Sequence, residues 1–522
     1  MLKDSNKSNL DVVKKQIGGE MTDPIERRKF WMAIAALSFA MINQSYYLVS
    51  VFPYAGFFAM KLVPSLTTNT AGTYAGLIAS SYMVGRMLTA VTWGKIADTI
   101  GRKPVYYWTF AFSGFFSIWF GLSTNIYSAL FSRFMMGFGN GLLVTTKTIV
   151  SELAKNDKKL ETEGLGIVMG MWGWGFIICP VISGYLSDPL KQYPNLQIVE
   201  NFKPMLSSYP FLLPNLVSVI FCILGFIFIH YFVDETLPEE RKKPITSLLK
   251  GYKNKIHKKS NDELLPLRDT KSQNKTNYTS STQQNLNKTD TKTTENESNP
   301  PTIAAIWAQP KLRHHIITHM SIVFSGILVD EAFPLFCIAG NVGLNLNERG
   351  IGSVLSGAGI LFIVGHFLFF GRIVEHFGIY SSVKIGTLFA SPIVILAPLS
   401  MVLNQGTSSL NDGISITLSA YILLMTILGI RNIAKNLAMT NVLISMNRTV
   451  SREQRATMNG VATLCGSFAK AVGPASAGFL VSFFLGSGYF SPTWGAYLLF
   501  GFISATGWGV FVYVILVLKQ YY

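Results

Sequence analysis

The chain has 522 residues, of which 49% are hydrophobic and only 14% charged. Soluble globular domains carry about a quarter of their residues as charged side chains, so this composition excludes an ordinary soluble protein. The apolar residues fall in stretches of about 20 or more, which at about 1.5 Å per residue cross a hydrocarbon core of about 30 Å. The sequence therefore predicts an all-α polytopic membrane protein.

The net charge of +16 would suit a nucleic-acid-binding protein, but the basic residues lie in loops between apolar stretches. Cytoplasmic loops of membrane proteins carry such an excess of Lys and Arg, so no nucleic-acid partner is expected. The cysteines offer neither a disulfide framework nor a zinc-ligand spacing, because all of them fall inside apolar stretches. We expect no resident metal and no cofactor. The cysteines are Cys179, Cys222, Cys337 and Cys465.

Residues 1–29 are polar and are predicted to form a cytosolic N-terminal tail without a cleaved signal peptide. Twelve apolar stretches follow, in two groups of six. Residues 30–233 are expected to form an N-terminal six-helix bundle, and residues 313–518 a C-terminal one. We place the twelve membrane-spanning helices at 30–60, 73–97, 104–123, 126–153, 163–186, 211–233, 313–338, 350–372, 379–403, 414–440, 456–485 and 494–518.

The two groups are separated by residues 234–312, which are rich in Lys, Asn, Thr and Ser and poor in large apolar residues. Such a segment cannot bury a core and is predicted to be a disordered linker. Lys and Arg gather on the side of the membrane that carries this linker, whereas the loops near Ser123 and Gly486 on the opposite side have none. The linker and both termini, including residues 519–522, are therefore placed in the cytosol.

Two motifs recur at matching places in the two groups. The segment Gly94-Lys-Ile-Ala-Asp98-Thr-Ile-Gly101 after the second stretch has an echo in Gly371-Arg-Ile-Val-Glu375-His-Phe-Gly378 after the eighth. Many membrane transporters are built from internal structural repeats such as a repeated six-helix unit, so the matching motifs predict two pseudo-symmetric halves. The second pair of motifs combines proline with glycines for close helix packing. Its residues are Gly175, Pro180 and Gly184 in the fifth stretch, and Gly473, Pro474 and Gly478 in the eleventh.

Charged side chains inside apolar stretches are costly and are therefore candidates for function. Arg86 lies in the second stretch and Arg133 in the fourth, and Asp330 and Glu331 are adjacent in the seventh. Adjacent helical positions point about 100° apart, so one carboxylate is expected to face a central cavity and the other a neighbouring helix. A carboxylate that takes up a proton, and releases it when an arginine approaches, would couple transport to a proton gradient. The alternative is a permanent salt bridge with a structural role.

Polar residues in other stretches suit the lining of a substrate cavity. The first stretch contributes Asn43, Gln44 and Tyr47, and the tenth contributes Arg431 and Asn432. The cations and amides of the tenth stretch favour an anionic or zwitterionic ligand.

The segment from Gly94 to Lys103, which we call the latch loop, closely resembles the signature loop between helices 2 and 3 of the major facilitator superfamily. Gly94 and Gly101 allow close helix approach, Asp98 counters a helix terminus, and Arg102 and Lys103 hold the loop in the cytosol. Such a loop acts as a conformational latch, and we expect Glu152 to brace Arg102. The resemblance implies the major facilitator fold.

Two other motifs also resemble this superfamily. Arg133 precedes Gly137-Phe-Gly139-Asn-Gly141, similar to the fourth-helix pattern whose arginine is associated with proton coupling in the family. Cys179-Pro-Val-Ile-Ser183-Gly184 resembles the antiporter motif, with Cys179 and Ser183 replacing two glycines.

A further set of motifs resembles the zinc-induced-facilitator-like branch, whose members are proton-coupled antiporters of vacuolar or plasma membranes that move small organic ions, metal chelators or their complexes. This chain lacks the usual cysteine motif before the first helix, and Thr99 replaces a usual basic residue, so the resemblance does not extend to zinc. The matching segments are Ser50-Val-Phe-Pro-Tyr54, Gly85-Arg86-Met-Leu-Thr89, Asp234-Glu-Thr-Leu-Pro238, Asp330-Glu-Ala-Phe-Pro334 and Lys470-Ala-Val-Gly-Pro474.

These observations predict a secondary active transporter, not an enzyme, that moves a small organic solute or metal chelate by alternating access in antiport with protons. We expect a monomer in a vacuolar, endolysosomal or plasma membrane, with the substrate, protons and the lipid bilayer as its partners. The P-loop pattern of ATP-driven pumps is absent from the sequence. Three alternatives stay open: a nutrient receptor or scaffold that signals through the linker, an uncoupled facilitator, and a membrane-embedded enzyme.

Overall fold

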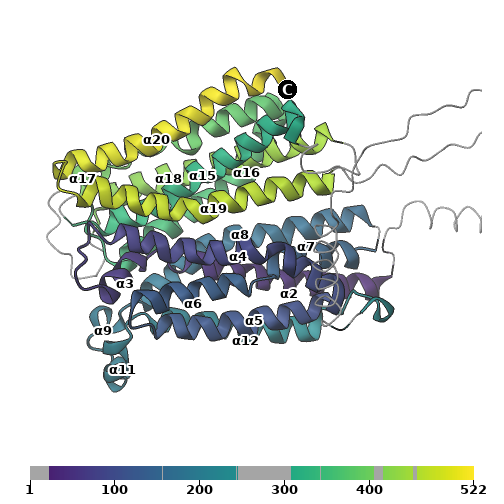
Figure 1. Ribbon diagram of the computed structural model, residues 1–522, viewed down its shortest axis with the longest axis horizontal. Helices are drawn as coiled ribbons and strands as arrows, with labels where there is room; N and C mark the ends of the chain where they lie inside the picture. Colours follow the sequence, from purple (N-terminus) through teal and green to yellow (C-terminus); the bar gives the residue numbers. More distant parts are fainter. Residues whose placement is uncertain are drawn as a thin grey trace, which may run out of the picture.

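The computed structural model describes residues 21, 23–155, 157–242, 244, 307–340, 343–404, 416–450 and 455–521. Within these ranges the chain forms helices and no strand. The helices gather into two bundles that lie side by side, one from the first half of the sequence and one from the second (Figure 1). Most of the predicted tail at 1–29 and of the predicted linker at 234–312 lies outside the described residues.

The N-terminal bundle is built from long helices whose starts are capped by side chains. Asp23, Asn125 and Asp157 accept hydrogen bonds from backbone N–H groups in the first turns of the helices that they precede. The elements are α2 (Pro24–Val49), α3 (Ala55–Leu62), α4 (Gly72–Ile100), α5 (Arg102–Gly121), α6 (Ile126–Phe138), α7 (Leu142–Leu153), α8 (Lys158–Leu186), α9 (Pro189–Gln192), α10 (Gln197–Asn201), α11 (Lys203–Ser208), α12 (Leu212–Phe232) and η1 (Glu239–Arg241).

The predicted fourth membrane-spanning helix is interrupted. Helix α6 ends at Phe138 and α7 begins at Leu142. The backbone N–H of Gly141, which opens α7, donates to the Thr109 hydroxyl of α5 at 3.2 Å. A side chain from another helix thus satisfies a backbone group that the break leaves unpaired.

The C-terminal bundle repeats this plan with fewer breaks. Its α16 covers the eighth predicted stretch and the first part of the ninth, which meet at Gly378, where φ is 75°, and the rest of the ninth forms η2 and α17. Glycine adopts this left-handed backbone without a steric penalty. The elements are α15 (Pro310–Ile338), α16 (Glu348–Ala390), η2 (Pro392–Leu396), α17 (Leu399–Leu403), α18 (Leu418–Thr449), α19 (Arg455–Gly486), α20 (Pro492–Leu516) and η3 (Leu518–Tyr521).

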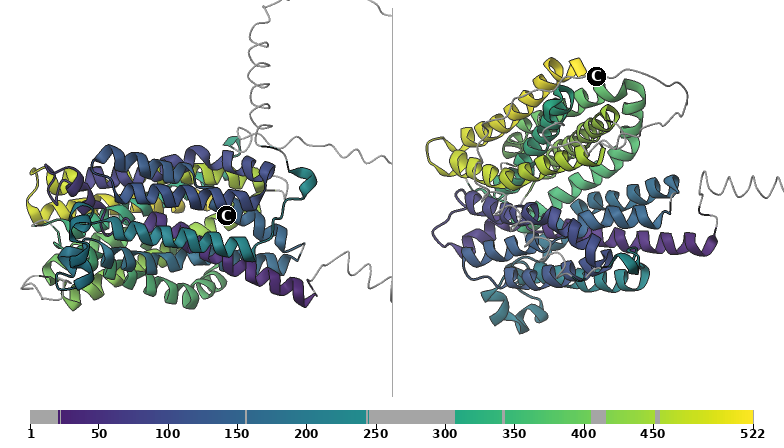
Figure 2. Two further views of the ribbon diagram at one scale, coloured as in Figure 1. Left: turned by 90° about the horizontal axis from the view of Figure 1, so that it is seen from below. Right: turned by 45° about the vertical axis from the view of Figure 1, so that its right-hand side comes forward.

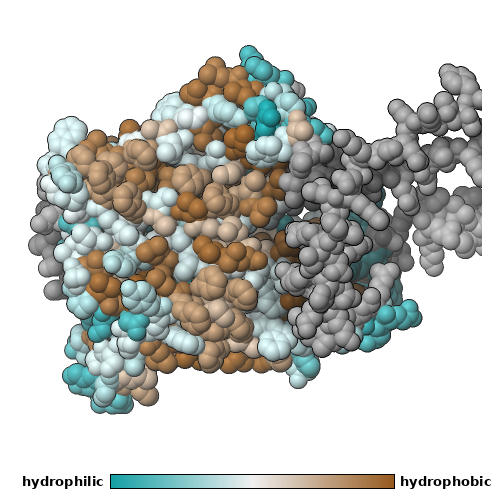
Figure 3. All heavy atoms as spheres, viewed as in Figure 1, coloured by the Kyte–Doolittle hydropathy of each residue, from teal (hydrophilic) through white to brown (hydrophobic). Residues whose placement is uncertain are grey.

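The outer surface suits a lipid environment. Eight of the described helices are long and apolar enough to cross a membrane by length and composition, and the count of twelve stays a prediction. Large apolar side chains such as Trp108, Phe367 and Leu516 are more than half exposed, and Figure 3 shows apolar residues spread over the middle of the visible face. Water would disfavour such a surface, whereas a hydrocarbon core accommodates it.

The two bundles meet near one end of the molecule, which we call the far end: the end where α4 and α16 begin. Aromatic residues from both halves form one buried cluster there, including Tyr54, Phe58, Phe333 and Phe336. We call the opposite end, where α4 passes into α5 at the latch loop, the latch end. The two bundles keep separate outlines in a second view (Figure 2).

Contacts between α4 and α19 fix the far end. The Thr73 N–H donates to the Ser482 hydroxyl at 2.9 Å, and the Ala475 N–H donates to the Ser80 hydroxyl at 2.9 Å. A Cβ added to Gly72 would lie 2.8 Å from the Gly478 carbonyl, so only small residues allow the helices to pack this closely.

Contacts between α8 and α16 form the second junction and show where the halves separate. A Cβ on Gly184 would lie 2.6 Å from the Glu348 carbonyl, and one on Gly173 would still meet Phe362 at 3.4 Å. Gly170 and Gly166 continue the same helical face toward the latch end, and there a Cβ would meet nothing within 4 Å. The halves are therefore in contact at the far end and apart toward the latch end.

Candidate functional site

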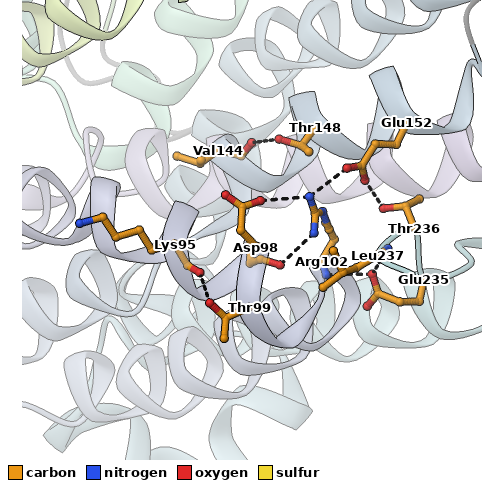
Figure 4. A network of polar contacts seen from close by, with 11 residues as sticks. Lys95, Asp98, Thr99, Arg102, Val144, Thr148, Glu152, Glu235, Thr236 and Leu237 are labelled. Atoms are coloured by element: carbon orange, nitrogen blue, oxygen red, sulfur yellow. Dashed lines mark hydrogen bonds and ion pairs between the residues drawn. The ribbon is translucent and has the colours of Figure 1, made fainter. Parts of the chain in front are cut away.

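The latch loop is assembled around the buried side chain of Arg102 (Figure 4). Its Nη2 forms ion pairs with Asp98 at 3.0 Å and with Glu152 of α7 at 2.9 Å. Its Nη1 donates at 3.2 Å to the Ala97 carbonyl, which also accepts a hydrogen bond from the Gly101 N–H at the end of α4. Gly101 has a φ of 110°, which lets the chain turn from α4 directly into α5. The structure thus joins Asp98, Gly101, Arg102 and Glu152 in one network.

Glu235 completes this network and was not among the predicted site residues. Its carboxylate accepts hydrogen bonds from the N–H groups of Arg102 at 3.0 Å and Lys103 at 3.1 Å. These are the unpaired first N–H groups of α5, where a negative charge is favourable. Thr236 also donates to Glu152. One signal in the sequence was the Asp234-Glu-Thr-Leu-Pro238 segment, which falls in the predicted linker, whereas Glu235 bonds to the latch loop and Thr236 to Glu152.

The remaining latch residues have simpler roles. Lys103 Nζ donates to the His230 carbonyl at 2.8 Å and so ties the start of α5 to the end of α12. Gly94 faces the Val144 side chain of α7 at a Cβ distance of 3.5 Å, which is an ordinary van der Waals contact.

The two adjacent carboxylates of α15 have different partners, as their angular offset predicts. Asp330 forms ion pairs with Arg431 and, at 3.0 Å, with Lys435, both on α18. Arg431 is 1% exposed and also donates to the Asn432 side chain at 2.9 Å and to the Gly326 carbonyl. Arg431 and Asn432, predicted to line a cavity, are therefore parts of an ion-pair network inside the C-terminal half.

Glu331 is buried and faces the other half of the molecule. Its carboxylate interacts electrostatically with Arg133 of α6. Arg133 is 1% exposed, donates to the Tyr47 carbonyl at 2.7 Å, and lies over the rings of Tyr82 and Phe120. Its Nε and Nη2 have no hydrogen-bond partner among the described residues. Among the described residues no ion pair within 4.0 Å joins the two groups, so their charges attract each other across the boundary at longer range, and two guanidinium nitrogens stay unpaired.

Two predicted cavity residues of the first stretch turn away from the other half. Asn43 and Tyr47 are buried against the Cys222 thiol of α12, with the Tyr47 hydroxyl 3.1 Å from the sulfur. The rotation of α2 therefore directs them into the N-terminal bundle and not into a cavity between the halves. Gln44 instead donates to the Tyr82 hydroxyl at 3.0 Å and so supports the ring against which Arg133 stacks.

Arg86 is not brought to the acidic pair. It is partly buried on α4 and interacts electrostatically with Lys470 of α19. No ion pair to Arg86 occurs within the described ranges. Arg86 and Arg133 both interact electrostatically with Tyr82, but Arg133 is the arginine that also interacts with Glu331.

The predicted packing motifs lie at helix crossings. Gly175 contacts Ser45 of α2, and Gly473 contacts Ile327 of α15, each within its own half. The other members form the two junctions between the halves, where glycine allows a helix to approach a backbone carbonyl. These members are Pro180 and Gly184 on α8, and Pro474 and Gly478 on α19.

In the part of the chain that the structure describes, no group of three or more His, Cys, Asp or Glu residues could hold a metal ion. The buried His315 of α15 is bonded instead to the Lys311 carbonyl at 2.7 Å and to the Ser445 hydroxyl at 2.9 Å.

Comparisons with known proteins agree with this architecture. The family model described as Major Facilitator Superfamily matches residues 32–474. The Arabidopsis thaliana protein named ZINC INDUCED FACILITATOR-LIKE 1 is 28% identical, over 83% of this chain and 80% of its own length. The Aspergillus fumigatus protein named Major facilitator superfamily multidrug transporter mfsB is 25% identical, over 88% of this chain and 79% of its own length.

Two solved structures share the fold. A bacterial homolog of the human lysosomal transporter Spinster, in an inward-facing and unoccupied conformation, has a TM-score of 0.57 at 15% identity and covers 96% of this chain and 97% of its own. A POT family transporter in complex with 5-aminolevulinic acid has a TM-score of 0.60 at 14% identity, with 94% and 96% covered.

Proposed function

This chain belongs to the major facilitator superfamily, and from that membership we propose that it moves a small organic solute or a metal chelate by alternating access, in antiport with protons. That it is an integral membrane transporter and not an enzyme follows from the family and from its transporter relatives. The solute, the coupling ion and the sites are the proposal. The observation that carries it is the buried Glu331 of one half facing the buried Arg133 of the other.

Alternating access is supported by the uneven contacts between the halves. They touch through glycine-rich junctions at the far end and are apart beyond Gly173 toward the latch end. A rocking movement of the two halves about the middle of the bundle would close the latch end and open the far end. The excess of Lys and Arg at the latch end favours its placement in the cytosol, so we assign the described arrangement to the state that is open to the cytosol.

The latch loop is proposed to keep the N-terminal half rigid during this movement. All ion-pair partners of Arg102, and the Glu235 carboxylate that caps α5, lie in the N-terminal half. Their contacts therefore survive when the halves separate. A rigid loop at the end of α4 then turns a small rotation of that half into closure of the latch end.

Proton coupling is proposed to use Glu331. The ionised carboxylate attracts Arg133 across the boundary between the halves, and protonation removes that attraction. Because this attraction exists only when Glu331 is ionised, the relative stability of the states open at the latch end and at the far end depends on whether Glu331 carries a proton. Asp330 is unsuited to this task, because two cations of its own half already hold it.

The experiment that tests this proposal compares two kinds of flux in proteoliposomes that contain the Glu331→Gln variant. We expect flux driven by a pH gradient to fall to background, whereas solute counterflow at equal pH continues, because only the proton site is lost. The Glu375→Gln variant, whose carboxylate is exposed on α16, is the control and should keep both. Gradient-driven flux of normal size in Glu331→Gln would contradict the role of Glu331 in coupling, whereas a wild type that shows counterflow but no gradient-driven flux would favour an uncoupled facilitator.

The proposal also includes the membrane in which the chain lies. By its similarity to the zinc-induced-facilitator proteins we place the chain in a vacuolar, endolysosomal or plasma membrane, as a monomer with cytosolic termini.

Deletion of residues 245–295 should leave flux unchanged if the chain is a transporter. In the receptor or scaffold alternative, the same deletion should instead abolish the signalling output, which the linker carries.

A further inference from the structure

Cations and carboxylates are unequally matched in the middle of the bundle. The two carboxylates of α15 already have partners: Asp330 holds Arg431 and Lys435, and Glu331 faces Arg133. Three further cations on helices of both halves have no acidic partner within the described residues. They are Arg86 on α4, Lys147 on α7 and Lys470 on α19.

These three cations form one group. Lys470 interacts electrostatically with both Arg86 and Lys147, and also with Lys435. Arg86 and Lys147 belong to the N-terminal half and Lys470 to the C-terminal half, so the group straddles the boundary. Arg86 and Lys470 are partly buried and Lys147 is exposed, and like charges that interact in this way repel each other.

The group lies where the halves begin to separate. Among the described hydrogen bonds between α4 and α19, the one between Ser80 and Ala475 lies nearest the latch end. Arg86 follows Ser80, and Lys470 precedes Ala475, each by less than two helical turns in the direction of the latch end. Ala471, the neighbour of Lys470, is still buried in the apolar cluster of the N-terminal half. The cations are therefore at the inner end of the space that opens at the latch end.

We infer that the transported solute is a small organic anion, carrying carboxylate or phosphate groups, that binds between Arg86, Lys147 and Lys470. An anion at this position would provide the negative charge that no described acidic residue provides to these cations. It would form charge-assisted hydrogen bonds to cations of both halves. It would also remove a repulsion that opposes closure of the latch end. This inference rests on the proposed transport function but not on its proton coupling, because Glu331 and Arg133 lie on other helices.

The test measures binding by the purified full-length protein in detergent, through the ligand-dependent rise of its thermal unfolding temperature. The probes are citrate, succinate and inorganic phosphate, with glycerol as the neutral probe and putrescine as the cationic one. We expect citrate or succinate to stabilise the protein. The Lys470→Met variant should bind the same anion about tenfold more weakly, since one charge-assisted contact is lost.

Two variants control for damage to the fold. Lys470→Arg keeps the charge and should keep most of the affinity. Lys384→Met removes a cation that lies instead over the Tyr380 ring on α16 and should bind as the wild type does. Equal affinity of wild type and Lys470→Met for the organic anion would overturn the inference. Stabilisation by putrescine or glycerol but by none of the anions would overturn it as well.

Counterflow in proteoliposomes separates this inference from the proposal on which it rests. Exchange of citrate or succinate would support both. Exchange of only neutral or cationic solutes would leave the transport function standing and contradict the anion site. Binding of an organic anion without exchange of any solute would support the anion site and contradict transport.

Discussion

The two halves carry the same glycine–acid–glycine spacing, but only the N-terminal copy is part of a network. Both copies end in a glycine with positive φ, 110° at Gly101 and 75° at Gly378. At Gly101 an added Cβ would collide with the Glu235 carboxylate, whereas at Gly378 it would meet nothing within 4 Å. The backbone turn is thus common to both halves, whereas the network of acidic residues around it is described only in the N-terminal half.

The difference comes from the charges outside the shared motif. Arg102 directly follows Gly101 and reaches acidic residues on two other segments. The residue after Gly378 is Ile379, and within the described ranges Arg372 of the C-terminal copy donates only to the Leu368 carbonyl of its own helix, at 3.1 Å. The spacing therefore encodes a helix-to-helix turn, and the latch needs an arginine after the turn with acids from elsewhere. Four substitutions test this comparison.

The largest effect is expected from Arg102→Ala. It removes both ion pairs and leaves the partly buried Glu152 without its cation, so we expect counterflow to fall about tenfold, equivalent to about 1.4 kcal/mol. The measurement is initial counterflow in proteoliposomes at matched protein content. Arg372→Ala removes the arginine of the C-terminal copy, which aligns with Lys95, and should stay close to wild type. Equal losses in the two variants would show that the halves are not different in this respect.

Gly101→Ala should rank second, with a loss of stability of about 2 kcal/mol. A side chain at positive φ costs about 1–2 kcal/mol, and here the added Cβ also displaces the Glu235 carboxylate. Gly378→Ala has the same backbone strain without the collision, so it should be clearly milder. Thermal unfolding of both variants in detergent checks the order. If Gly378→Ala is the less stable of the two, the contact between Glu235 and Gly101 does not stabilise the latch loop.

Glu235→Gln should have a smaller effect, about 1 kcal/mol. The amide can still accept hydrogen bonds at the start of α5, but it no longer carries the negative charge that favours a helix N-terminus. Because this contribution is electrostatic, the difference from wild type should shrink as salt rises. Unfolding temperatures at low and high salt measure it, and a difference that does not depend on salt would argue against the charge.

The smallest effect is expected from Ile379→Arg, which places an arginine after the second turn. No described acidic residue forms an ion pair with the C-terminal copy, so the new arginine should not build a latch and flux should stay unchanged. A gain in thermal stability similar to the loss in Arg102→Ala would show that the arginine alone is sufficient.

Much of this architecture could be predicted from the sequence, because charges and glycines stand out in apolar stretches. The contact between Arg102 and Glu152 follows from the latch-loop pattern, and the residues of both packing motifs do lie at helix crossings. The family assignment is confirmed by the match over residues 32–474.

The rest depends on helix rotation and on long-range contacts, which a single sequence does not specify. A modest rotation of α2 decides that Tyr47 contacts Cys222 of α12 and not the space between the halves. Asp330, rather than Glu331, holds the cations of α18 because of how α15 is turned. Glu235 was missed since its partners lie more than 130 residues earlier in the chain, and its polar neighbourhood resembles a linker.

The most direct test of the account measures two distances across the halves by double electron–electron resonance. One pair of spin labels replaces Gly166 and Gly371 near the latch end, and the other replaces Ser65 and Tyr489 at the far end. Comparing samples at neutral and acidic pH, the account predicts that one distance grows while the other shrinks, and that Glu331→Gln no longer responds to pH. Two distances that stay fixed, or that change in the same sense, would contradict alternating access coupled to protons.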